Sequence, residues 1–234
     1  MPATLLAIDT ATEVCSVALA CGEQVVEVAE PVGQKHSARV LPMIHELLRA
    51  QGLVLADCDA IAFGAGPGAF TGLRIACGIA QGLAFGAGKP VLPVGNLAAL
   101  ALAAQTAKPG SKRILAAIDA RMQEVYWALY ATAPQLEELT APALATAAEL
   151  AALCRLHGPD LVAGDALLAF PQQAAQLDCA LAPDLRASAA GIARLARRRF
   201  GQGAAMPPEQ AAPLYVRDRV ARTIGERRAD GAVP

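Results

Sequence analysis

One succession of short apolar segments occurs twice in this chain of 234 residues, and the repeat restricts the folds it can adopt. Residues 5–8 form an apolar run that ends at Asp9, and residues 113–118 form a second run that ends at Asp119. In each copy further extended segments follow after tight turns, which is the pattern of an antiparallel β-meander. A repeated unit of this size predicts a duplicated fold with two lobes. The further segments are residues 15–20 and 25–29 in the first copy, and 124–131 and 136–139 in the second.

After the first meander, helical and extended patterns alternate. Residues 37–51 carry apolar side chains at helical spacing, and Gly52 stands where a left-handed C-terminal cap is expected. Because helices join the later strands, those strands must run parallel. The order β-β-β-α-β-α-β-α is that of a ribonuclease-H-like lobe. The remaining elements are strands 60–63 and 91–94 with helices 72–85 and 97–104, then strand 161–164 with helices 147–156 and 187–200.

The polar, turn-rich residues 108–112 predict the boundary between the lobes. We therefore predict an α/β protein with an N-terminal ribonuclease-H-like lobe over residues 1–107 and a C-terminal one over residues 108–217. The apolar residues 214–216 are expected to dock on the body of the protein. Residues 218–234 are charged and contain glycine, so we expect a mobile tail there.

Composition excludes several classes of protein. Apolar residues make up 55% of the chain, which excludes disorder over most of its length. The 20 basic and 21 acidic residues leave a net charge of -1, which argues against a stand-alone nucleic-acid binder. Apolar runs fall short of the roughly 18 uncharged residues of a membrane span. The six cysteines form no C-x-x-C pair, and the start lacks a basic leader region, so we expect a cytoplasmic protein.

Residues 64–74, Gly-Ala-Gly-Pro-Gly-Ala-Phe-Thr-Gly-Leu-Arg, are the most distinctive stretch. A glycine-rich loop between a strand and a helix can hold a phosphate group, because backbone amides and the helix dipole point at it. The acidic residue of a dinucleotide-binding loop and the Gly-Lys-Ser/Thr of a P-loop do not follow. Two interpretations remain, a tightly packed turn or a phosphate contact. The residues that could contact phosphate are Asp9, Thr10, Thr12, Gly66 and Gly68.

Asp9 and Asp119 stand at matching places in the two copies. Each could face a metal-bound nucleotide, Asp119 together with Arg121, or each could form an ordinary turn in which the side chain bonds the local backbone. A metal site has little support, because the histidines do not share a helical face at the spacing that chelation prefers. They are His36, His45 and His157.

The predicted helix over residues 72–85 carries small residues in two rows. A glycine inside a helix costs about 1 kcal/mol relative to alanine, so repeated glycines one turn apart indicate the close approach of another backbone. That backbone belongs either to the chain's own sheet and first helix or to a partner subunit. The rows are Gly72, Ala76 and Ala80, and Gly78, Gly82 and Gly86.

Taken together, these segments resemble the TsaB (YeaZ) family, accessory subunits of the bacterial machinery that makes threonylcarbamoyladenosine in tRNA. The stretch over residues 66–75 is the most specific, although Ala69 replaces its usual serine. The resemblance runs from the first predicted strand to residue 217. The matching segments are residues 6–19, His36-Ser37 with residues 41–44, residues 66–75, 119–121 with 124–126, and 213–217.

The resemblance implies a fold of the actin and sugar-kinase (ASKHA) type. It also implies a catalytic paralogue, TsaD, as partner, with the ATPase TsaE joining the assembly and tRNA reached only through the complex. That paralogue carries a helical His-x-x-x-His metal pair which this chain lacks. The implied function is a non-catalytic scaffold that binds and activates TsaD, which modifies the tRNA adenosine next to the anticodon. Alone, the chain is expected to form a homodimer, with no membrane partner.

In the family, two helices of the first lobe contact the catalytic subunit, and here these are residues 37–51 and 72–85, the second of which carries the glycine rows. No cofactor is expected, apart from weak ATP or ADP binding in the cleft or at the subunit interface. The expected partner-binding residues are Val40, Leu41, Ile44, Leu48, Thr71, Leu73, Arg74, Cys77, Gly78, Gln81 and Gly82.

Two other functions compete with this one. A phosphotransferase of the sugar-kinase type would use Asp9, Thr12 and residues 66–68 around a magnesium nucleotide, and would hydrolyse that nucleotide by itself. A metallopeptidase-like hydrolase would need a cluster of metal ligands, which the scattered histidines do not provide.

Overall fold

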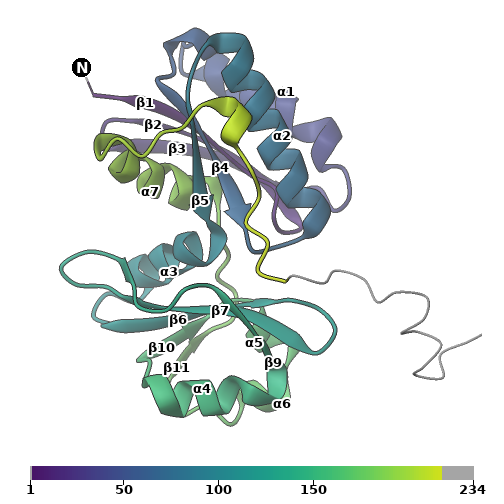
Figure 1. The fold of residues 1–234 in the computed structure, drawn as a ribbon, viewed down its shortest axis with the longest axis vertical. Helices are drawn as coiled ribbons and strands as arrows, with labels where there is room; N and C mark the ends of the chain where they lie inside the picture. The colour runs from purple at the N-terminus through teal and green to yellow at the C-terminus, as the bar shows by residue number, and fades with distance from the viewer. Residues whose placement is uncertain (1, 218–234) are drawn as a thin grey trace, which may run out of the picture.

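The computed structural model describes residues 2–217, which form two lobes, each built on one β-sheet (Figure 1). In the first lobe the described residues form a five-stranded sheet, in which an antiparallel meander continues into two parallel strands. In order across the sheet, its strands are β3 (Gln24–Pro31), β2 (Val14–Cys21), β1 (Thr4–Asp9), β4 (Ala60–Gly66) and β5 (Val91–Gly95).

The second sheet repeats this arrangement, which confirms the duplication predicted from the sequence. Its first strand again pairs antiparallel with the next strand and parallel with a later one. The predicted third strand is shorter than expected, and β9 is an addition that the sequence pattern did not predict. In order, the described strands are β11 (Ala180–Ala182), β10 (Leu161–Ala163), β6 (Arg113–Asp119), β7 (Glu124–Ala131) and β8 (Glu137–Glu138), and β9 (Ala143–Thr146) also pairs with β7.

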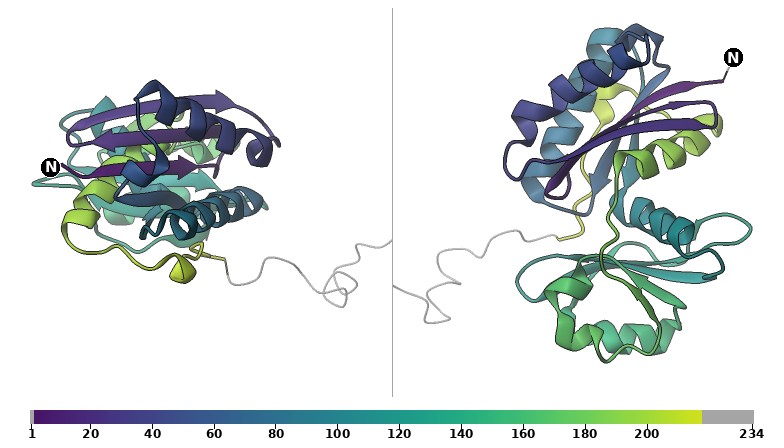
Figure 2. Two further views of the ribbon diagram at one scale, coloured as in Figure 1. Left: turned by 90° about the horizontal axis from the view of Figure 1, so that it is seen from above. Right: turned by 180° about the vertical axis from the view of Figure 1, so that it is seen from behind.

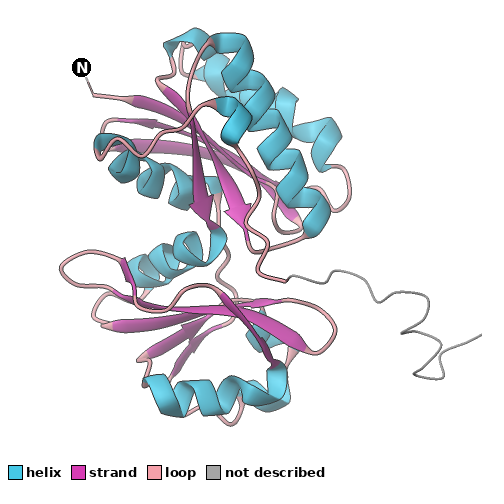
Figure 3. Cartoon of the chain, in the orientation of Figure 1, coloured by secondary structure: helices cyan, strands magenta, loops and turns pink. Residues whose placement is uncertain are grey.

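Helices cover the outer face of each sheet (Figure 3). Alternate residues of a strand point to opposite faces, so Leu6 and Ile8 of β1 pack under the outer helices of the first lobe. Leu115 and Ala117 of β6 do the same in the second lobe. The outer helices are α1 (His36–Ala50) and α2 (Phe70–Ala87) in the first lobe, and α4 (Leu150–His157), α5 (Ala166–Ala169) and α6 (Pro171–Ala174) in the second.

Helices α3 (Asn96–Ala107) and α7 (Ala189–Gly201) lie between the two sheets (Figure 2). Although α3 follows the first sheet in sequence, it packs against β6 of the second. Helix α7 follows the second sheet and packs against β1 and β2 of the first. The inner faces carry small side chains such as Ala7 and Ala116, which let these helices approach closely. Each sheet is thus covered on its inner face by a helix from the other half of the sequence.

This exchange of helices corrects the predicted lobe boundaries. Residues 108–217 do not form one lobe, because α7 and the segment after it return to the first sheet. Met206 forms a bridge with Val91 of β5, and the short helix η3 (Pro208–Gln210) packs against α2. The predicted docking of residues 214–216 is confirmed, since the Leu214 amide donates to the Ala65 carbonyl at 2.7 Å. The predicted mobile tail, residues 218–234, lies outside the described residues.

Element ends differ from the predictions by a few residues. Helix α2 begins at Phe70, two residues before the predicted start, and α1 begins at His36. Gly52 has a φ of +67°, which confirms the left-handed residue expected after α1. The predicted helix over residues 147–156 divides into the 3₁₀ turn η2 (Ala147–Glu149) and α4, and a further 3₁₀ turn, η1 (Leu55–Asp57), precedes β4.

Candidate functional site

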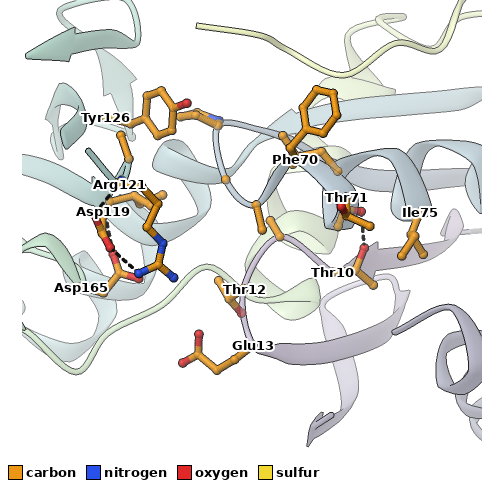
Figure 4. Close-up of a pocket in the computed structure, with 18 of the residues that line it drawn as sticks. Thr10, Thr12, Glu13, Phe70, Thr71, Ile75, Asp119, Arg121, Tyr126 and Asp165 are labelled. Carbon is orange, nitrogen blue, oxygen red and sulfur yellow. Dashed lines mark hydrogen bonds and ion pairs between the residues drawn. The ribbon is translucent and has the colours of Figure 1, made fainter. Parts of the chain in front are cut away.

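A cleft of about 850 Å³ lies between the lobes (Figure 4). The first lobe contributes the turn between β1 and β2 and the start of α2. The second lobe contributes the turn between β6 and β7, and Asp165. The sequence-based expectation that the two Asp-containing turns occupy matching places is therefore confirmed. Figure 4 shows Thr10, Thr12, Glu13, Phe70 and Thr71 from the first lobe and Asp119, Arg121, Tyr126 and Asp165 from the second.

The same side-chain hydrogen bond closes the turn that follows the first strand in both lobes. The Ala11 amide donates to Asp9 Oδ1 at 3.1 Å, and the Arg121 amide donates to Asp119 Oδ1 at 2.8 Å. An Asp side chain that accepts from the amide two residues on is an Asx turn. Both segments therefore contain the local side-chain hydrogen bond that the turn interpretation predicts.

Asp9 is 1% exposed and belongs to a buried polar cluster. Its Oδ1 also accepts from Asn96 Nδ2 at 2.9 Å, and Asn96 Oδ1 accepts from the Gly66 amide at 2.7 Å. Burial raises the pKa of Asp9 to about 6, and the hydrogen bond from Asn96 opposes that rise. Asp9 and Asn96 together thus join β1, the end of β4 and the start of α3.

One glycine in the loop before α2 and one in the first turn of α2 allow this region to pack against the turn after β1. A Cβ atom on Gly72 would lie 1.8 Å from the Thr10 carbonyl oxygen, and one on Gly68 would lie 2.8 Å from the Ala11 Cβ. The Thr10 hydroxyl donates to the Gly72 carbonyl at 2.7 Å, and the Ala69 amide donates to the Ala11 carbonyl at 2.9 Å. These contacts favour a closely packed turn over a phosphate-binding loop.

The five residues named as phosphate contacts separate into two groups. Asp9 and Gly66 do not line the cleft, which corrects that part of the expectation. The reason is that both bond to Asn96 beneath its floor. Thr10, Thr12 and Gly68 do line it, but the hydroxyls of Thr10 and Thr12 already donate to backbone carbonyls. Weak binding of ATP or ADP stays a prediction.

On the second lobe, the turn between β6 and β7 borders the cleft with a strained backbone. Arg121, Met122 and Gln123 have φ values of 61°, 55° and 62°, which non-glycine residues rarely adopt. Asp165 Oδ1 accepts from the Asp119 amide at 2.9 Å, and burial raises the pKa of Asp165. Sequence reasoning did not single out Asp165. Its place just after the parallel strand β10 is the signal that could have found it.

The small-residue rows of α2 face different surroundings. Gly72, Ala76 and Ala80 are buried. At each glycine of the other row, a Cβ atom would meet nothing within 4 Å among the described residues. That row does not pack on the chain's own sheet or first helix, so the intramolecular interpretation is wrong for it. Its members are Gly78, Gly82 and Gly86, all exposed.

The exposed face of α2 is unusually apolar. By length and composition alone, the 18-residue helix could cross a membrane, yet it lies against β4 with 33% of its length buried, and it carries Arg74. Phe85, near its end, is 78% exposed, and Leu41 on α1 is 48% exposed. Within the described residues, the chain itself does not cover these apolar side chains.

Burial corrects part of the expected partner-binding set. Side chains that point from α1 and α2 into the core cannot supply surface in this conformation. They are Val40, Ile44, Leu48, Leu73 and Cys77, at most 7% exposed. Surface remains at Leu41, Thr71, Arg74, Gly78, Gly82 and the half-buried Gln81.

The three histidines have different surroundings. His36 lines the cleft, and it is 7% exposed with its Nε2 unpartnered among the described residues. His45 is exposed on α1, and His157 lies against Trp127 in the second lobe. Within residues 2–217, no three His, Cys, Asp or Glu side chains gather in a group that could hold a metal ion.

Two sheets of one topology, helices exchanged between them and a cleft at their junction define a protein of the actin and sugar-kinase-like class. A family model described as "TsaD: tRNA N6-adenosine threonylcarbamoyltransferase" matches residues 27–222. The chain belongs to the TsaB (YeaZ) family within this broader group. The tRNA threonylcarbamoyladenosine biosynthesis protein TsaB of Escherichia coli K12 is 39% identical over 226 residues, or 93% of this chain and 96% of that protein.

Two further comparisons agree with this assignment. TsaB of Haemophilus influenzae is 53% identical over 124 residues, a match that spans 53% of this chain and 52% of that protein. The solved structure of YeaZ from Pseudomonas aeruginosa has a TM-score of 0.81 at 39% identity, covering 91% of this chain and 99% of that one.

Proposed function

We propose that this chain takes part in the biosynthesis of threonylcarbamoyladenosine in tRNA, at the adenosine next to the anticodon, as a non-catalytic subunit. In this role it binds the catalytic paralogue TsaD through the outer face of α1 and α2 and activates it. The observation that carries the proposal is the row of exposed glycines on α2, which have no packing role within the described chain. The curated names of the TsaB relatives support the pathway.

The exposed glycines of α2 reduce the stability of their own helix. Each destabilises the helix by about 1 kcal/mol relative to alanine, and no contact among residues 2–217 offsets that cost. Gly78, Gly82 and Gly86 are four residues apart, so they lie in one row along the helix. Without side chains, this row lets a second helix backbone approach closely. The exposed Phe85 and Leu41 supply apolar area beside it.

A partner with a related helix pair is a suitable cover for this face. Four helices meeting in this way would bury the roughly 800 Å² per partner that a stable interface needs. A subunit that binds one conformation of TsaD more tightly than another shifts the population towards it, which is how binding alone can activate. The catalytic paralogue carries a helical His-x-x-x-His metal pair. In α1 the residue four positions after His36 is Val40, which is buried in the core, and this supports a non-catalytic role.

Arginine substitutions on the glycine row test the interface. Gly78→Arg or Gly82→Arg places a long charged side chain on the face, and we expect loss of co-elution with TsaD and loss of tRNA modification. Gly201→Arg, at an exposed and equally open position on α7, is the matched control and should retain both. Circular dichroism checks that all three variants fold. Full binding by the folded Gly78 and Gly82 variants would contradict the proposal.

The same face explains the expected behaviour of the isolated chain. Without TsaD, two copies should cover each other's α1 and α2 and form a homodimer, measurable by light scattering after size-exclusion chromatography. Added TsaD should convert the homodimer into the heterocomplex, with TsaE joining afterwards. A homodimer that persists in the Gly82→Arg variant would place self-association on another surface.

A further inference from the structure

The last described segment, residues 211–217, crosses from the first lobe to the second (Figures 1 and 2). Its beginning follows η3, which packs on α2, and its end reaches the turn between β6 and β7. The segment borders the cleft on the way, because Leu214, Tyr215, Val216 and Arg217 all line it. Contacts to both lobes make this segment a mechanical connection between them.

On the first lobe, the segment is held by backbone and aromatic contacts. The Leu214 amide donates to the Ala65 carbonyl, and a Cβ atom on Gly66 would lie 2.7 Å from the Leu214 carbonyl oxygen. Arg74 Nε donates to the Tyr215 hydroxyl at 3.0 Å. The guanidinium of Arg74 lies 3.9 Å from the centre of the Phe70 ring, which in turn lies 5.7 Å from the Tyr215 ring.

On the second lobe, one side chain makes the contacts. Arg217 Nη2 donates to the Ala120 carbonyl at 2.9 Å and forms an ion pair with the Glu124 carboxylate. Its Nη1 contacts Met122 Sδ at 3.4 Å. The guanidinium also lies 6.0 Å from the Tyr126 ring, and the side chain is only 15% exposed.

These contacts surround the strained part of the turn. Ala120 precedes the three residues with left-handed backbone, Glu124 follows them, and Met122 is the central one. A non-glycine residue keeps such a conformation only where its surroundings hold it there. One guanidinium nitrogen, Nη2, bonds both ends of the turn, and the second, Nη1, contacts its centre, so the planar group of Arg217 spans the whole turn.

We propose that residues 213–217 form an interlobe latch in which Arg217 sets the width of the cleft and holds the turn between β6 and β7. Helices α3 and α7 join the two sheets through a shared apolar core, which acts as the hinge. On the side of the cleft, the latch holds the two lobes together, because Arg217 connects the segment to the second lobe. This inference does not depend on the proposed function, since it concerns the isolated chain.

Hydrogen exchange of the full chain tests the latch. In Arg217→Ala, the Ala120, Glu124 and Leu214 amides should exchange at least about tenfold faster than in the unaltered chain, because their hydrogen bonds open more often. Small-angle scattering should show a larger radius of gyration. Arg198→Ala, which removes an exposed arginine from α7, is the matched control and should change neither quantity.

Two milder variants keep the test decisive if Arg217→Ala does not fold. Arg217→Lys retains the charge but loses the planar group and its Nη1 contact with Met122, and Glu124→Gln removes the ion pair alone. Each should accelerate exchange in residues 118–126 about threefold or more while exchange in β2 stays unchanged. Folded variants that exchange at the normal rate in residues 118–126 and 211–217, with an unchanged radius of gyration, would overturn the proposal.

Discussion

The two lobes share the order and direction of their central strands but differ in what covers the outer face. The first lobe carries long helices, α1 with 15 residues and α2 with 18. The second carries α4 with eight residues and α5 and α6 with four each. The two lobes therefore share the arrangement of their sheets, whereas their outer helices differ in length. Only in the first lobe do they leave, among the described residues, a long apolar face with a row of glycines.

The Asx turns of the two lobes also differ in what surrounds them. Asp9 is buried beside Asn96, and the glycine loop before α2 fills the space around its turn. Asp119 is half-buried, and its carboxylate pairs with the 87% exposed Arg121 at 2.9 Å. Both turns border the cleft, but the first is packed tightly against α2 whereas the second has a left-handed backbone.

The largest effect should come from breaking the packing of the first-lobe turn. Gly72→Ala would put a methyl group 1.8 Å from the Thr10 carbonyl oxygen, so the start of α2 must move away from the turn. Overpacking at a backbone contact of this kind should lower the free energy of unfolding by about 3 kcal/mol or more. Urea denaturation of the purified chain measures it.

Gly82→Ala, in the same helix but in open space, is the matched control for that experiment. It should leave the chain as stable or slightly more stable, because alanine favours the helix. A Gly72→Ala variant as stable as the Gly82→Ala variant would show that the first-lobe turn tolerates displacement.

Sequence reasoning located the strands well because their signal is local. The run that ends at Asp9 and the run that ends at Asp119 were both confirmed, and so were the parallel strands joined by helices. The glycine rows were also visible, since spacing within one helix is a property of the sequence. Which row faces the sheet was not visible, because Gly72 and Gly78 are the same residue type and only the contact with Thr10 distinguishes them.

The exchange of α3 and α7 between the lobes could not be predicted for a related reason. The sequence pattern predicts that each helix belongs to the lobe that precedes it in the chain. Their placement depends on the alanine-lined inner faces of sheets distant in the chain, such as Ala7 and Ala116. Likewise, Val40 and Ile44 were expected at the partner interface from the family resemblance, but their helical spacing places them on the buried face of α1. Arg217 lies in a segment with no periodic pattern, so its contacts with the second lobe had no local signal.

The buried Asp9 should make the stability of the chain depend on pH. Because its folded-state pKa of about 6 exceeds the ordinary 3.8, folding takes up a proton between those values. The folded state should therefore gain about 1 kcal/mol as the pH falls from 7 to 5. Asp9→Asn should remove this gain, since the amide oxygen can still accept from Ala11 and Asn96 but carries no charge. Asp119→Asn is the equivalent change in the second lobe and serves as the comparison.

Urea denaturation at pH 5, 6 and 7 compares the three proteins, and the difference between the unaltered chain and Asp9→Asn isolates one group from the other carboxylates. Equal pH slopes in the two would mean that the Asp9 carboxylate is already neutral or well solvated in the folded state.

The smallest effect tests whether the glycines of the outer face are there for packing with a partner. Gly78→Ala should stabilise the isolated chain by up to about 1 kcal/mol, because the helix gains alanine and the added methyl group meets no described atom. The reverse substitution in the second lobe, Ala152→Gly on the exposed side of α4, should cost a similar amount. Both are measured by urea denaturation at protein concentrations too low for self-association. If the glycine is needed for the close approach of a partner helix, the more stable Gly78→Ala variant should bind TsaD more weakly. A variant that gains stability and binds TsaD equally well would show that the interface tolerates a side chain at this position.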